Sequence, residues 1–184
     1  NLSNPFVPKY IISLIVRDST ILELAPTITA IVLAGKVGSH IASQLGTMQI
    51  TEQIDALEVM GINSTSYLVL PKIIGAVITF PMLVALAGFL SIYGGYLAGW
   101  LSGAISPSEY IQGLRFDFHP IYVPFAIIKS VVFAFLIASI SAFQGYFTKG
   151  GALEVGQSST KAVTNSCIAV LVADYLLAQL LVGG

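Results

Sequence analysis

The chain has 184 residues, of which 55% are hydrophobic and only 9% are charged, and its formal net charge is -1 at pH 7. Soluble domains usually carry about 25% charged residues, so this chain holds more apolar side chains than a water-exposed globule of its size buries. The near-neutral charge excludes a basic surface for nucleic acid, and the single cysteine excludes a disulfide framework. The composition therefore predicts an all-α polytopic membrane protein.

Four stretches of the chain are long and apolar enough to cross a hydrocarbon layer of about 30 Å as helices. The first stretch is interrupted by Arg17, Asp18 and Glu23. These charges predict an outer segment over residues 1–20, a break near Asp18, and a membrane helix that begins only at residue 21. The expected membrane helices cover residues 21–45, 73–101, 121–147 and 162–182, and residues 1–184 form a single transmembrane domain.

The connections between these helices differ in charge. Residues 46–72 and 144–161 lie on one side of the predicted membrane and, with Lys36, hold four lysines, whereas residues 102–120 on the other side hold Arg115. Basic residues prefer the cytoplasmic side of a membrane protein. We therefore expect the first two connections to face the cytoplasm and both chain termini to face outside.

Small residues recur at every fourth position in two of the predicted helices. Such stripes let helix backbones approach closely in lipid, where packing drives association. The alternative is that glycine and alanine are simply common in membrane helices. We expect contact faces at Ala34, Gly38, Ala42 and Gly46 on the first helix, and at Ser91, Gly95, Gly99 and Gly103 on the second.

A polar island of helical composition, TEQIDALEVMG over residues 51–61, separates the first two membrane helices. At 100° per residue, its acids fall on one arc and its apolar side chains on another. It is either an ordinary solvated interfacial helix or a docking element, whose apolar edge enters a groove of a soluble partner while the acids meet a basic rim. The acids are Glu52, Asp55 and Glu58, and the apolar edge is Ile54, Leu57 and Met60.

Two ionisable residues lie deep in the predicted membrane helices. Lys129 lies about nine residues, or roughly 13 Å, inside the third helix, and Asp174 lies at nearly the same depth in the fourth. An unpaired charge near the bilayer centre costs several kcal/mol, so we expect the two residues to pair or to line a wet cavity. They form either a structural ion pair or part of a polar path that responds to a substrate.

Glu23 has two interpretations. Thr20 and Glu23 have the spacing of a capping box, in which the two side chains satisfy the first amides of a helix. Pro26 follows closely and should disturb the helix, which frees backbone carbonyls that need partners or water. A cavity at this point would give Glu23 a binding role instead.

The sequence contains no pattern that predicts catalysis. His40 and His119 have no cysteine or carboxylate at metal-ligand spacing, so we expect no metal site. Gly35 and Lys36 lack the rest of a phosphate-binding loop. We therefore expect a chain that is not an enzyme, holds no cofactor itself, and takes its energy from a partner.

Several motifs along the chain fall into a known pattern. The most specific is EQIDALEVMG, within the run AGKVGSHIASQLGTMQITEQIDALEVMGI over residues 34–62. Together the motifs resemble the MlaE-type (YrbE) permease family, the membrane subunit of lipid ABC transporters that work with MCE proteins. The other matches are ELAP at 23–26, YLVLPKIIG at 67–75, IKSVVFAF at 128–135, GYFTKGGALEVGQSSTKAV at 145–163 and VLVADYLL at 170–177.

The resemblance implies a homodimer in the bacterial cytoplasmic membrane that moves phospholipid, or a similar lipid, to or from a periplasmic MCE protein. A separate ABC ATPase, which holds the ATP and magnesium, would dock on the 51–61 helix. Family members usually have an interfacial helix and a further membrane helix before the ELAP motif, and we expect neither in this chain. The implied lipid-binding residues are Leu22, Glu23 and Leu24, and the implied ATPase-coupling residues are Glu52, Gln53, Asp55, Leu57, Glu58 and Met60.

Two other classes of function stay open. A stand-alone secondary transporter or channel would use Lys129, Asp174 and Glu23 as an ion relay and would work without nucleotide. A non-transporting membrane scaffold would use the small-residue stripes and the acidic helix only for assembly. Reversing the charge of the acids in the 51–61 helix separates these classes, because only the ABC permease needs them to bind an ATPase.

Overall fold

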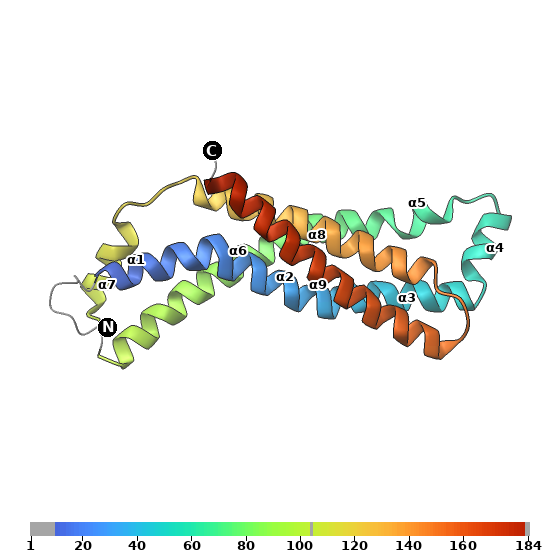
Figure 1. The fold of residues 1–184 in the computed structure, drawn as a ribbon, viewed down its shortest axis with the longest axis horizontal. Coiled ribbons are helices and arrows are strands. Elements are labelled where there is room, and N and C mark those ends of the chain that lie inside the picture. The colour runs from blue at the N-terminus through green and yellow to red at the C-terminus, as the bar shows by residue number, and fades with distance from the viewer. Residues whose placement is uncertain (1–9, 104, 183–184) are drawn as a thin grey trace.

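In the computed structural model, which describes residues 10–103 and 105–182, the chain forms an elongated bundle of helices with no strand in the described part (Figure 1). Four of the described helices are long and apolar enough to cross a membrane. These two findings confirm the expected all-α polytopic fold. The spans cover Tyr10–Ile50, Ser64–Leu101, Tyr122–Tyr146 and Ala152–Leu180.

The helical elements follow one another with few breaks. The first span contains α1 (Tyr10–Ser19), a π-helical segment (Thr20–Ile28), α2 (Thr29–Leu33), a second π-helical segment (Ala34–Gly38) and α3 (Ser39–Ile50). The short helices α4 (Gln53–Val59) and α5 (Ser64–Leu68) lead into α6 (Leu70–Leu101), which is followed by α7 (Pro107–Arg115), α8 (Tyr122–Tyr146) and α9 (Ala152–Val182).

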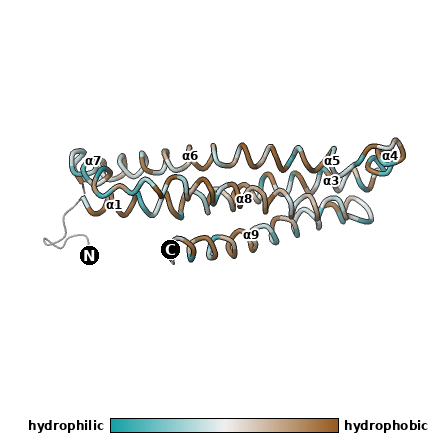
Figure 2. The backbone as a smooth tube through the Cα atoms, turned by 90° about the horizontal axis from the view of Figure 1, so that it is seen from above, coloured by the Kyte–Doolittle hydropathy of each residue, from teal (hydrophilic) through white to brown (hydrophobic). Residues whose placement is uncertain are grey.

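The two short helices α4 and α7 lie at opposite ends of the bundle (Figure 1). Figure 2 shows hydrophobic residues along the long helices, with more hydrophilic stretches toward the ends where α4 and α7 lie. The turn between α8 and α9 lies at the α4 end (Figure 1). The bundle therefore has two more polar ends joined by apolar spans, as expected of helices that cross a hydrocarbon layer and reach water on both sides.

The first span is one continuous helix, so the expected break near Asp18 is wrong. Arg17 does not interrupt the helix because its side chain is buried against the end of α7. Its guanidinium donates hydrogen bonds to the carbonyl oxygens of Leu114 at 2.9 Å and Phe116 at 2.8 Å, and it pairs with Asp18 at 2.7 Å. A buried charge whose donors are satisfied in this way is compatible with an apolar environment.

Thr20 and Glu23 do not form the expected capping box. The backbone is already helical at Ser19, and no side chain caps the segment that follows. Pro26 instead lies inside the π-helical segment. Proline removes a backbone donor from a helix, and a local wider turn is one way in which a helix accommodates such a defect. The disturbance expected at Pro26 therefore takes the form of a wider turn within the helix and not of a helix start.

α8 is the central helix of the bundle and packs against α9, α6 and α3. Its residues Phe133, Ala134 and Ile137 are fully buried. α8 approaches α3 closely at Gly145, where an added Cβ would lie 2.6 Å from the carbonyl oxygen of Ala42. Any side chain at Gly145 would therefore push the two helices apart.

The first stripe of small residues faces this contact. A Cβ added to Gly38 would lie 2.8 Å from Ser141 Oγ, and one added to Gly46 would lie 3.2 Å from Thr148 Oγ1. Both alanines of the stripe are also buried. The stripe thus lets the first span approach α8 and the turn that follows it.

The second stripe has a different partner. A Cβ added to Gly95 would lie 2.9 Å from the hydroxyl of Tyr110 in α7, whereas the nearest atoms to one added to Gly99 are 4.0 Å away in Ile105. Gly103 has a φ of +68° and ends the helix in a turn. A Cβ added to Gly95 would also lie 3.2 Å from the side chain of Val16 in the first span. The second stripe therefore contacts both α7 and the first span.

The sequence predicted α7 only as part of the connection over residues 102–120. It begins with a capping box between Ser106 and Glu109, and the hydroxyl of Tyr110 donates to the carbonyl oxygen of Ile92 at 2.9 Å. Burial raises the pKa of Tyr110 above its ordinary value. These contacts hold α7 against α6.

α9 begins at Ala152, ten residues before the expected start of the fourth membrane helix. Its first turn is capped by Glu154, whose carboxylate accepts a hydrogen bond from the amide of Gly151 at 2.8 Å. Hydropathy identifies only the part of a helix that lies in lipid. Because residues 157–161 are polar, the predicted membrane helix began after them and did not include the first part of α9.

Candidate functional site

A buried ionic cluster joins three helices in the middle of the bundle. The side chain of Lys129 in α8 has no exposed surface, and its ammonium nitrogen lies 3.0 Å from Glu23 Oε2 and 2.5 Å from Asp174 Oδ1. The same nitrogen donates a hydrogen bond to the carbonyl oxygen of Leu22 at 3.1 Å. The contact with Asp174 is an ion pair outside hydrogen-bonding geometry. The structure thus brings Lys129 and Asp174 together and adds Glu23 to them.

The three side chains of this ionic cluster differ in exposure. Lys129 is 0% exposed, Asp174 is 17% exposed and Glu23 is 46% exposed. Two carboxylates around one ammonium group offset the large cost of keeping that group away from water. Glu23 is the member that a bound molecule reaches most easily, so it is the best candidate for a contact with a ligand.

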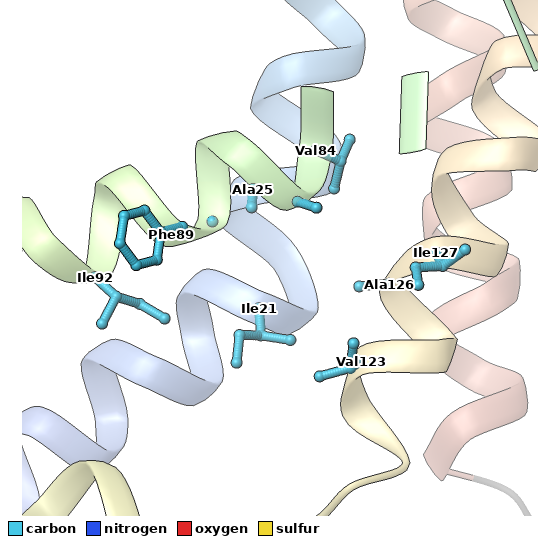
Figure 3. Close-up of a pocket in the computed structure, with 10 residues that line it drawn as sticks. Ile21, Ala25, Val84, Phe89, Ile92, Val123, Ala126 and Ile127 are labelled. Atoms are coloured by element: carbon cyan, nitrogen blue, oxygen red, sulfur yellow. The ribbon is translucent and has the colours of Figure 1, made fainter. Parts of the chain in front are cut away.

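An apolar cleft of about 220 Å³ opens near the cluster, between the first span, α6 and α8 (Figure 3). Ala126 in its wall lies about one helical turn before Lys129 on α8. Every residue that lines the cleft is apolar, so the cleft fits part of a hydrocarbon chain better than a polar solute. The lining includes Ile21 and Ala25 from the first span, Val84, Gly88 and Phe89 from α6, and Ala126 from α8.

The expected lipid-binding residues lie beside this cleft but do not line it. Leu22 uses its carbonyl oxygen to accept from Lys129, and the side chain of Leu24 is exposed. Ile21 and Ala25, one position further out on each side, line the cleft. Positions four apart share one face of a helix, which explains why these two residues face the cleft together.

At the end of the bundle away from α7, the short helix α4 is shorter than the expected 51–61 helix. Glu52 precedes it with a φ of +58°, a conformation that turns the chain sharply after α3. Ile54 is only 1% exposed and packs inside the chain. The expectation that Ile54 belongs to a docking edge is therefore wrong, because this side chain anchors α4 to its own bundle.

The remaining residues of α4 divide into two groups. Glu58 is engaged within the chain, since its carboxylate accepts hydrogen bonds from Ser64 at 2.8 Å and from Tyr146 at 3.2 Å. Val59 is 89% exposed, and Leu57 is half-buried. Apart from Glu58, the exposed residues of α4 and of the two positions that flank it are Glu52, Gln53, Asp55, Ala56, Val59 and Met60.

Several of the residues that form these sites carry no signal in the sequence. Ser64 and Tyr146 are single polar residues in no recognisable motif, and their pairing with Glu58 crosses up to 88 positions of the chain. The cleft residues Val84 and Gly88 follow the buried face of α6, and a helical hydrophobic pattern could have identified that face but not the cleft.

The four spans, the apolar cleft with the buried ionic cluster among them and the exposed short helix at one end define a class of polytopic helical membrane protein. Comparison with known proteins gives the family. The family described as Permease MlaE matches residues 1–180, and the chain belongs to this family. The match extends the resemblance to the residues before Glu23.

Relatives cover most of the chain. It is 40% identical over 158 residues to a probable ABC transporter permease protein of Rickettsia bellii, which covers 86% of this chain and 61% of that relative. It is 38% identical over 163 residues to a probable ABC transporter permease protein of Synechocystis, covering 88% and 62% respectively. It is also 36% identical over 157 residues to the protein TRIGALACTOSYLDIACYLGLYCEROL 1, chloroplastic, of Arabidopsis thaliana, covering 85% and 45%. The chain thus spans less than two thirds of the length of these relatives.

Proposed function

We propose that this chain is the membrane subunit of an ABC transporter that moves phospholipid, or a similar lipid, between the cytoplasmic membrane and a periplasmic MCE protein. The family match and the relatives named as ABC transporter permeases support the transport role. The Arabidopsis relative carries a glycolipid in its name, which supports a lipid cargo. In this proposal the chain forms a homodimer and takes its energy from a separate ATPase that holds ATP and magnesium.

The observation that carries the proposal is the placement of two different surfaces along one helix, α8. Near the start of α8, Ala126 and Ile127 form a wall of the apolar cleft. At its end, Tyr146 contacts α4 through Glu58. Lipid binding at the cleft and ATPase binding at α4 would therefore occur at separate sites that α8 connects, as a transporter that converts ATP hydrolysis into lipid movement requires.

The cleft is suited to an acyl chain, because it removes apolar surface from water and offers no polar partner. Glu23 lies close to the cleft and is partly exposed, so its carboxylate is placed to contact the polar part of a lipid while Lys129 holds it in position. On this view, the buried ionic cluster of Lys129, Glu23 and Asp174, called the Lys129 cluster below, fixes the geometry of the binding site.

The exposed surface of α4 is suited to a soluble ATPase. Asp55 and Glu52 present negative charge and Val59 and Met60 present apolar surface, a combination that matches a groove with a basic rim. Because this end would then face the cytoplasm, the α7 end would face the MCE protein.

The proposal is tested by purifying the complex and reconstituting it into vesicles. The double variant Glu52→Lys with Asp55→Lys should release the ATPase and abolish ATP-driven lipid movement while the fold stays intact. Gln112→Lys, which adds a positive charge to an exposed position in α7, is the matched control and should keep the ATPase bound. An ATPase that stays bound to the double variant would contradict the proposed role of α4.

The competing proposal is an ion relay through Lys129, Asp174 and Glu23, which their mutual contact favours. It predicts transport without nucleotide, so the same vesicles measured without ATP separate the two proposals. A non-transporting scaffold would move no lipid in either condition.

A further inference from the structure

The end of α8 meets α4 and α5 in a small polar junction. Ser64, the first residue of α5, is 2% exposed, and its hydroxyl donates to Glu58 Oε1 at 2.8 Å. The hydroxyl of Tyr146, the last residue of α8, lies 3.2 Å from the same carboxylate oxygen and 2.7 Å from Ser64 Oγ. The Glu58 junction, as we call these three residues, therefore joins three helices through one carboxylate oxygen.

The Glu58 junction holds α4 to α5 and α8 through side-chain hydrogen bonds. Ile54 packs against the chain through apolar contact only, and such contact tolerates sliding because it is not directional. Hydrogen bonds to a carboxylate are directional and stronger than those between neutral groups. Glu58 therefore fixes the orientation of α4 relative to α8, while Ile54 fixes its depth.

α8 continues from this junction to the other functional elements without interruption. It is one α-helix from Tyr122 to Tyr146, so roughly 25 Å of helix separates Tyr146 from Lys129. Gly145, directly before Tyr146, is pressed against the backbone of Ala42 in α3. A movement of the Tyr146 end of α8 is therefore carried along a packed, rigid element toward the buried cluster and the cleft wall.

We propose that Glu58 is a positioning residue that couples α4 to α8 through Ser64 and Tyr146, so that displacement of α4 by the ATPase moves α8 and, with it, the Lys129 cluster and the cleft. This inference rests on the proposed function, because it takes α4 to be the ATPase-binding helix. It assigns to Glu58 a role inside the chain, in place of the contact with the ATPase that its acidic side chain first suggested.

The test measures the orientation of α4 and the coupling of transport in the same complex. Spin labels at Val59→Cys in α4 and Phe143→Cys in α8, in a Cys167→Ser background, report the distance between the two helices. The wild-type junction should give one narrow distance distribution. Glu58→Ala should lower the population of that distance about tenfold, since it removes the charged acceptor of two hydrogen bonds.

Three variants sharpen this result. Tyr146→Phe removes one donor at little change in volume and should have a smaller effect in the same direction. Adding it to Glu58→Ala should cause little further loss, because the two variants break the same junction. Glu58→Gln keeps an oxygen that can accept both bonds and should restore most of the wild-type distribution. Tyr67→Phe, at an exposed tyrosine of α5, is the matched control and should change nothing.

The transport readout distinguishes a positioning role from a structural one. With Glu58→Ala, the ATPase should remain bound and hydrolyse ATP, but the lipid moved per ATP should fall about tenfold, whereas Glu58→Gln should recover it. An unchanged distance distribution in Glu58→Ala would overturn the inference, whatever the transport result. A wild-type complex that moves no lipid would instead contradict the proposed function, while the distance measurement would still decide the role of Glu58.

Discussion

The two polar contacts of α8, the Lys129 cluster in the middle of the bundle and the Glu58 junction at its end, are built in different ways. Lys129 is fully buried and is matched by two carboxylates, whereas Glu58 is exposed and bound by two neutral hydroxyls. A charge inside an apolar span requires charged partners, while a charge near the end of a span can be satisfied by water and by hydroxyl groups. The difference indicates that the cluster depends on matched charges, whereas the junction depends on the geometry of its hydrogen bonds.

The largest loss of stability is expected when the Lys129 cluster loses its cation. Lys129→Met should lower the stability of the protein by about 3–5 kcal/mol, because it leaves Glu23 and Asp174 without the cation that they share. Thermal unfolding in detergent measures this loss. Lys161→Met, at an exposed lysine of α9, is the matched control.

Pairing within the cluster is tested by exchanging charges. Asp174→Asn alone should destabilise or inactivate the protein. The exchange Lys129→Asp with Asp174→Lys should partly restore stability relative to Lys129→Asp alone, since it returns a cation to the site. An exchange that restores nothing, in a protein whose single variants are as stable as the wild type, would show that the two residues do not stabilise each other.

A smaller effect is expected where α3 and α8 touch. Gly145→Ala should cost about 1–3 kcal/mol, because the added Cβ would contact the backbone of Ala42 and a packed backbone yields little. Gly75→Ala provides the comparison, since nothing lies within 4 Å of an added Cβ there. That variant should instead gain up to about 1 kcal/mol from helix propensity. Equal melting temperatures for the two variants would contradict the close contact.

Filling the cleft should reduce the amount of bound lipid. Val84→Trp places a large side chain in the apolar cleft and should reduce the lipid that remains bound after purification by about fivefold, as measured by mass spectrometry of extracted lipid. Met82→Trp adds the same bulk to an exposed position on α6 and should leave bound lipid unchanged. Equal losses from both variants would show that the cleft is not the binding site.

The smallest effect is expected at Gly99. The nearest atoms to an added Cβ are 4.0 Å away, so Gly99→Ala should change stability by less than about 0.5 kcal/mol. Gly95→Ala should cost more, because its Cβ would meet the hydroxyl of Tyr110. Thermal unfolding of the two variants therefore tests whether Gly95 is the closely packed glycine of the two, although the spacing pattern treated both alike.

The long-range contacts explain what the sequence could and could not predict. Hydropathy alone was sufficient for four membrane-spanning helices, because lipid imposes a minimum length of apolar chain. Arg17 and Asp18 were interpreted as a break because the carbonyl groups that satisfy Arg17, at the end of α7, lie almost a hundred residues away. A local pattern cannot show that a charge in an apolar helix will be satisfied by a distant carbonyl group.

The candidate site shows the same limit. Lys129 and Asp174 were expected to meet, since their depths in the predicted helices were similar. Glu23 was grouped with them only in the ion-relay alternative, because its spacing from Thr20 also matched a local capping box, and local spacing carries no information about a lysine 106 positions away. For α4, periodicity identified the helix but assigned Ile54 to the outer edge, since periodicity shows that a face is apolar and not what covers it.

The central claim, that this chain works as the lipid-moving subunit of an ABC transporter, is tested most directly by native mass spectrometry of the complex extracted gently from its own membrane. The account predicts two copies of the full-length permease with two ATPase subunits and bound phospholipid. A complex that repeatedly contains no nucleotide-binding partner, under conditions that preserve other ABC transporters, would contradict the claim and favour the ion relay.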